Sequence, residues 1–202
     1  MLRSRIALFC ATLASLTSTT LSAQSHPFYL GVSAGATRLT APRGNFPQTT
    51  APTIAASVGM GVTHGFGFEG RLTGLSAAVT ERRNPGVLSE GLYTRGVRAL
   101  LLEPTLTFRP TAWNAWRVKP FGSVGAVLAA LRTSQESDTP EEWSSASEAG
   151  VAGALGLEAV LYRRISLVGR ASYREMFTGL GGPQRELGLP GPALDFGVRV
   201  NR

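Results

Sequence analysis

Apolar and polar side chains alternate along the last part of the chain. Between residues 192 and 200 every second residue is apolar (Leu194, Phe196, Val198 and Val200), and the residues between them are Asp195, Gly197 and Arg199. Successive side chains of a β-strand point to opposite faces, so the segment predicts a strand with one apolar and one charged face. We therefore expect that serine is tolerated at Gly197, on the charged face, and that arginine is not tolerated at Val198, on the apolar face.

The same alternation predicts seven further strands. Their approximate ranges are 28–39, 54–63, 66–73, 99–108, 117–131, 150–161 and 165–174. The range 99–108 starts with a continuous apolar run before it alternates. The range 117–131 contains so much Gly and Ala that neither of its faces can be assigned to lipid or to an interior. With the segment from Ala193 the total is eight, an even number that lets the first and last strands pair antiparallel.

The connectors between these strands alternate in length. His64-Gly65 and the ranges 110–116 and 162–164 are short, whereas the ranges 41–52, 81–94, 133–147 and 178–192 are long and rich in turn-forming residues. Short periplasmic turns and long outer loops are the arrangement of transmembrane β-barrels in bacterial outer membranes. A soluble β-sandwich has no reason to alternate its loops in this way.

The N-terminus has the three-part order of a secretory signal peptide. Arg3 and Arg5 precede an apolar run from Ile6 to Leu16, and Leu21-Ser22-Ala23 forms a cleavage site. The polar residues 17–20 interrupt the run well short of the roughly 20 residues of a membrane helix. We therefore expect a signal peptide at 1–23 and a barrel domain at 24–202. Cys10, the only cysteine, is then lost on cleavage.

The chain is basic, with a formal net charge of +7 at pH 7. The signal peptide holds two of the 20 basic residues and none of the 13 acidic ones, which leaves +5 for the mature chain. An exported protein meets no nucleic acid. Its expected anionic partners are the phosphates of outer-membrane lipid and lipopolysaccharide.

Three short motifs carry a family resemblance. They are Phe28-Tyr29-Leu30-Gly31, Gly65-Phe66-Gly67-Phe68-Glu69-Gly70 and Lys119-Pro120-Phe121-Gly122. In this order and spacing, residues 24–202 resemble the small outer-membrane β-barrel superfamily of the OmpA transmembrane domain and OmpX-like proteins. The resemblance implies an all-β fold, an eight-stranded antiparallel up-and-down transmembrane barrel in a Gram-negative cell envelope. It also implies a monomer inserted by the barrel insertion machinery. Such proteins usually end on an aromatic residue, whereas this chain ends Val200-Asn201-Arg202.

Charged residues fall on the predicted inward face of several strands. The interior of an eight-stranded barrel is just wide enough for its own side chains, and buried charges require partners. Four acidic and four basic residues are therefore expected to form an ion-pair network that fills the lumen, with a narrow gated pore as the alternative: Glu69, Arg71, Glu103, Glu158, Arg170, Arg174, Asp195 and Arg199.

Candidate catalytic and metal-binding residues are few. The resemblance includes barrels that hydrolyse lipid A with a His, Ser and Glu set at the outer rim. Here His26 lies in the N-terminal tail and His64 in a predicted periplasmic turn, so we expect no catalytic residues. Without a His pair or a cysteine at ligand spacing, we expect no metal and no cofactor. The acidic segment 136–142 lacks the glycine spacing of a calcium loop and is read as a solvated loop.

Two groups of residues are candidates for the membrane surface. Arg82, Arg83, Arg95 and Arg98 flank the second long connector, where they are expected to contact lipopolysaccharide phosphates. Trp113, Trp116 and Tyr162 fall in short turns and are expected to form an interfacial aromatic girdle.

These observations predict an outer-membrane barrel with a structural, adhesion or surface-interaction role. A narrow channel or transporter, a lipid-modifying enzyme with His64 on the outer side, and a soluble periplasmic ligand-binding barrel remain alternatives.

Overall fold

The computed structural model describes residues 28–40, 49–63, 65–83, 91–113, 116–135, 143–162, 164–177 and 189–202. The predicted signal peptide, His26, His64 and the acidic segment 136–142 lie outside the described residues. Within these ranges, no helix is long and apolar enough to cross a membrane.

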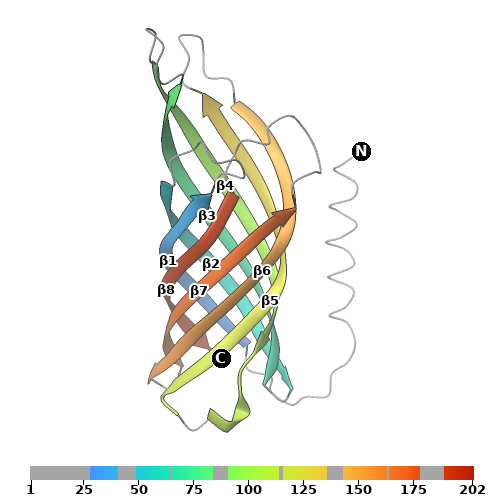
Figure 1. The fold of residues 1–202 in the computed structure, drawn as a ribbon. Helices are drawn as coiled ribbons and strands as arrows, with labels where there is room; N and C mark the ends of the chain where they lie inside the picture. The colour runs from blue at the N-terminus through green and yellow to red at the C-terminus, as the bar shows by residue number, and fades with distance from the viewer. Residues whose placement is uncertain are drawn as a thin grey trace.

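Eight strands form one closed barrel in which each strand pairs antiparallel with the next and β8 pairs with β1 (Figure 1). The predicted fold is therefore confirmed. A short 3-10 helix, η1 (Thr111–Trp113), lies between β4 and β5. The strands are β1 (Phe28–Thr40), β2 (Thr49–Thr63), β3 (Phe66–Arg83), β4 (Gly91–Phe108), β5 (Val118–Gln135), β6 (Trp143–Tyr162), β7 (Ile165–Phe177) and β8 (Leu189–Asn201).

The barrel has an inner end, with the connections 64–65, 109–117 and 163–164, and an outer end, with the connections 41–48, 84–90, 136–142 and 178–188. The connection 109–117 is longer than 84–90 and 136–142, so the predicted alternation of short and long connectors holds only in part. At the outer end β3 to β6 reach beyond the other strands (Figure 1). The hairpins pair as far as Arg83 with Gly91 and Ser134 with Trp143. The predicted connectors 81–94 and 133–147 were therefore too long. Alternation marks a strand only where one face is apolar, and backbone pairing continues past that region.

The outer surface of the barrel wall is apolar. Ile54, Leu155 and Phe196 are 74%, 75% and 63% exposed, and each is one of a row of outward apolar residues on its strand. Strand β5 joins the same pattern, with Val124 and Leu128 outward and Phe121, Val127 and Leu131 inward. Both faces of β5 are apolar, which is why its sequence did not reveal the orientation.

Aromatic residues gather at the inner end. The rings of Phe66 and Phe108 lie 4.9 Å apart, and Phe28, Trp116 and Tyr162 are also exposed there. Nothing is described for the side chain of Trp113. The turn between β2 and β3 places Gly65 at φ 88°, in the left-handed region that glycine tolerates best. Its carbonyl accepts a hydrogen bond from the Arg109 N–H at 2.7 Å, which ties this turn to the end of β4.

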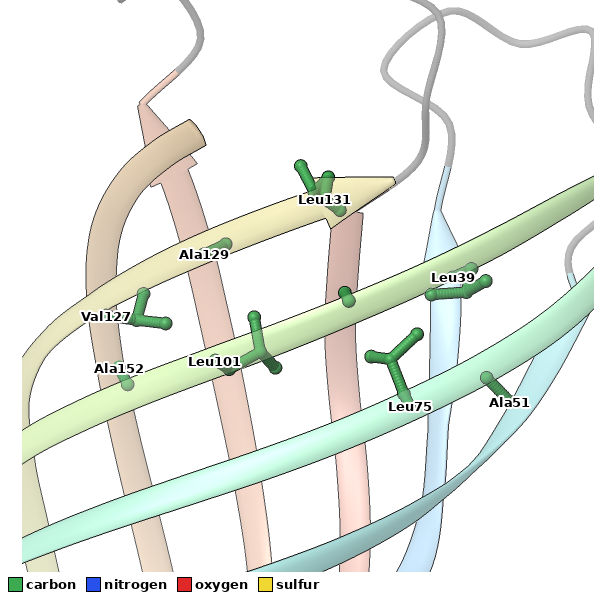
Figure 2. Packing of buried hydrophobic residues seen from close by; sticks show 9 residues of the cluster. Leu39, Ala51, Leu75, Leu101, Val127, Ala129, Leu131 and Ala152 are labelled. Carbon is green, nitrogen blue, oxygen red and sulfur yellow. The ribbon is translucent and has the colours of Figure 1, made fainter. Parts of the chain in front are cut away.

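An apolar cluster packs in the outer half of the lumen (Figure 2). On β3 the cluster residue Leu75 lies closer to the outer end than Glu69 and Arg71. On β4, which runs in the opposite direction, Leu101 lies closer to the outer end than Glu103. This apolar layer explains the continuous apolar run at the start of the predicted fourth strand. The buried members of the cluster are Leu39, Ala51, Leu75, Ala99, Leu101, Val127, Ala129, Leu131 and Ala152.

One expectation about the lumen is wrong. A side chain at Gly197 would collide with the backbone carbonyl of Val32 and with Ser33, which lies 2.6 Å from the position a Cβ would occupy. Strands β1 and β8 pair closely at this point. Serine is therefore not accommodated at Gly197 unless the wall shifts.

Candidate functional site

The structure brings all eight predicted charged residues into the lumen, on the inner side of the apolar cluster. Each is almost completely buried, between 1% and 5% exposed. They come from five strands around the barrel: Glu69 and Arg71 on β3, Glu103 on β4, Glu158 on β6, Arg170 and Arg174 on β7, and Asp195 and Arg199 on β8.

Glu69 is the centre of the first group. Its Oε1 lies 2.5 Å from Nη1 of Arg170, and its Oε2 lies 3.0 Å from Nη2 of Arg199. The Tyr29 hydroxyl donates a third hydrogen bond to Oε2 at 2.7 Å. Because Glu69 lies on β3 and its partners on β7, β8 and β1, these contacts cross the lumen and connect non-adjacent strands.

Arg199 extends the group toward the inner end. It pairs with Oε2 of Glu158 at 2.8 Å, and its guanidinium lies 3.9 Å from the centre of the Tyr29 ring. Arg109 reaches the same Glu158 oxygen at 3.5 Å and lies 5.0 Å from the Tyr29 ring. We call these six residues the Glu69 group: Tyr29, Glu69, Arg109, Glu158, Arg170 and Arg199.

Arg71 is the centre of the second group. Its Nη2 lies 2.9 Å from Oδ2 of Asp195, and its Nε lies 3.6 Å from Glu103, which also pairs with Arg174. The Thr53 hydroxyl donates to Asp195 at 3.1 Å. The Arg71 group, Arg71, Glu103, Arg174 and Asp195, thus contains two charges of each sign.

Arg109 and Tyr29 are site residues that sequence reasoning missed. Arg109 immediately follows β4, and continues its inward series Glu103, Thr105 and Thr107. The same alternation that identified Glu103 was therefore a usable signal for Arg109. With Arg109 the Glu69 group holds three basic and two acidic residues.

A small hollow lies among the described charged residues. Its volume is about 20 Å³, and it lies beside Glu69, Arg71 and Arg170. This volume accommodates roughly one water molecule. A water there has polar partners in the guanidinium and carboxylate groups around it. Among the described residues, no three His, Cys, Asp or Glu side chains form a group that could hold a metal ion.

The arginines predicted to contact lipopolysaccharide lie in the two strands that flank the connection 84–90. Arg82 and Arg83 belong to β3, and Arg95 and Arg98 to β4. Arg98 is exposed on the wall, and the side chains of the other three are outside the described part of the structure.

The sequence matches the family described as "Outer membrane protein beta-barrel domain" over residues 8–197. The chain belongs to this family. Outer-membrane barrels have an apolar outer wall and a polar interior. Here the wall is apolar, and the part of the lumen on the inner side of the apolar cluster is lined by charged residues. The protein is therefore located in the bacterial outer membrane, with its outward apolar residues in lipid.

Solved structures show the same fold at low sequence identity. OprG from Pseudomonas aeruginosa is 12% identical, with a TM-score of 0.61, and the match covers 88% of this chain and 96% of that one. Ail, the attachment invasion locus protein of Yersinia pestis, in complex with the heparin analogue sucrose octasulfate, is 11% identical (TM-score 0.57; 88% and 99% covered). Neisserial surface protein A is 16% identical (TM-score 0.54; 86% and 96% covered). No curated protein matches the sequence.

Proposed function

We propose that this outer-membrane barrel is a closed, monomeric membrane anchor with a surface-interaction role. In this proposal it displays the outer parts of β3 to β6 and the outer connectors to the cell's surroundings. The observation that carries the proposal is that side chains fill the described lumen. An apolar cluster occupies its outer half, and two ion-paired groups lie on the inner side of this cluster. The surface role is supported by Ail, a protein of the same fold that is named for attachment.

The proposal includes no enzymatic role. A nucleophile must lie within reach of a base, and the eight predicted lumen charges are instead paired with one another. Outer-membrane lipid, lipopolysaccharide and the barrel insertion machinery are the proposed partners.

Conductance in planar lipid bilayers tests the closed lumen against the channel alternative. The folded protein should give no current steps above background at either polarity, because the apolar cluster and the two ion-paired groups occupy the described lumen. A known porin in the same bilayer controls for detection, and vesicle insertion of the same sample controls for incorporation. Steady unitary conductance of the inserted protein would favour the channel.

A further inference from the structure

A hollow of about 440 Å³ lies on the outer surface of the wall and crosses β4, β5 and β6. We call it the outer-wall groove. The side chains that line it and are exposed to the surroundings are Arg98, Leu100, Ala130, Arg132, Ser145 and Ser147. It is separate from the lumen, because the intervening Ala99 and Leu131 point inward into the apolar cluster.

Strand register arranges the groove in two rows. Arg98 pairs with Arg132, and Arg132 pairs with Ser145, so these three residues form a row across the three strands. Leu100, Ala130 and Ser147 form the next row toward the inner end. Adjacent strands lie about 4.8 Å apart. A group the size of a phosphate can therefore contact both guanidiniums, which pair well with phosphate oxygens.

The row of Arg98 and Arg132 lies where the apolar wall ends. On β4 the outward residues from Phe108 to Leu100 are apolar, and Arg98 is the next outward residue toward the outer end. The range 100–108 has the length of a membrane-spanning strand, which is about 9–11 residues. The arginine row is thus level with lipid headgroups of the outer leaflet, and the Leu100 row is level with the start of the acyl chains.

We propose that the outer-wall groove binds one phosphate of lipid A, the phosphorylated glycolipid of the outer leaflet. Arg98 and Arg132 contact the phosphate, the Ser145 and Ser147 hydroxyls bond to sugar or ester oxygens, and an acyl chain lies along Leu100 and Ala130. This inference deepens the proposed lipopolysaccharide partnership and rests on the placement of the β3–β4 and β5–β6 connections on the outer side of the membrane. It does not depend on a closed lumen.

Native mass spectrometry of the detergent-purified protein with diphosphorylated lipid A tests the groove. Arg132→Ala should weaken binding at least tenfold, because one of two phosphate contacts is removed. Arg38→Ala is the matched control: Arg38 is exposed at the outer end of β1, a strand that does not border β4, β5 or β6. It should change binding less than twofold. Wild-type protein should bind dephosphorylated lipid A at least as weakly as Arg132→Ala binds the diphosphorylated form, because both arginine contacts are then lost.

Equal loss of binding in Arg132→Ala and Arg38→Ala would overturn the inference, since the loss would then follow from the lower net positive charge of the protein and not from the groove. Phosphatidylglycerol that displaces lipid A at equal concentration would overturn the choice of lipid. Arg132→Lys should retain more binding than Arg132→Ala. Gel mobility of unboiled samples shows that each variant is folded. A conducting barrel that still binds lipid A would contradict the closed lumen and leave the groove intact, so the two proposals fail separately.

Discussion

Replacing Glu69 by alanine should lower the free energy of unfolding of the barrel by about 3–5 kcal/mol, because removing one partner of a buried ion pair leaves the other charge buried without compensation. Glu69 is 3% exposed and accepts hydrogen bonds from Arg170, Arg199 and Tyr29. Its removal leaves Arg170 without its carboxylate partner, and leaves Arg199 with Glu158 alone. Urea unfolding of the protein inserted in lipid vesicles measures the loss as a lower midpoint.

Glu175→Ala provides the control for Glu69→Ala. Glu175 is an exposed carboxylate on the outer wall of β7 that accepts a hydrogen bond from Tyr173. Exposed polar contacts contribute little to stability, so its midpoint should stay close to that of the wild type. Equal midpoints for the two variants would mean that the Glu69 group does not hold the barrel together.

Arginine at Leu155 should cost about 2–4 kcal/mol, the penalty for a charge on the lipid face near the bilayer midplane. Leu155 is 75% exposed in the middle of β6, between Gly122 of β5 and Ala171 of β7. Folding into vesicles across a urea series measures the cost. The same measurement applies to Val198→Arg, which lies closer to the inner end of β8.

Leu161→Arg is the matched control on the same strand and the same face. Leu161 is 62% exposed and lies at the inner end of β6, beside the exposed Tyr162. The penalty for arginine falls to about 0–1 kcal/mol near an interface. If the middle of β6 lies near the bilayer midplane, the cost at Leu155 must exceed that at Leu161, and a reversed order would contradict this placement.

The strand pattern was predictable wherever one face meets lipid and the other meets charges. In β8 the outward Phe196 and Val198 and the inward Asp195 and Arg199 differ so strongly that alternation alone assigned both faces. Alternation gave no answer for β5, because Val127 faces the apolar cluster and Val124 faces lipid. Alternation also predicted strands that are too short at the outer end, because the backbone pairing of β3 with β4 and of β5 with β6 continues beyond the alternating residues.

Membership of the charged lumen was more predictable than the pairing within it. Alternation placed Arg71 and Asp195 inward, but their 2.9 Å contact crosses the barrel between β3 and β8. That contact depends on the stagger and tilt of all eight strands, which no single segment encodes. The same holds for Gly197, where the approach of β1 excludes a side chain.

Orientation decides which end of the barrel meets the environment, and the surface role and the lipid A groove both depend on it. Single cysteines can be introduced cleanly because the chain's one cysteine, Cys10, lies in the predicted signal peptide. Ser137→Cys falls between β5 and β6, and Ala112→Cys falls in the exposed η1 helix at the inner end. On intact cells a membrane-impermeant maleimide should label position 137 and leave position 112 unlabelled until the outer membrane is opened. Labelling of position 112 from outside would show that the barrel has the opposite orientation, and it would contradict both proposals.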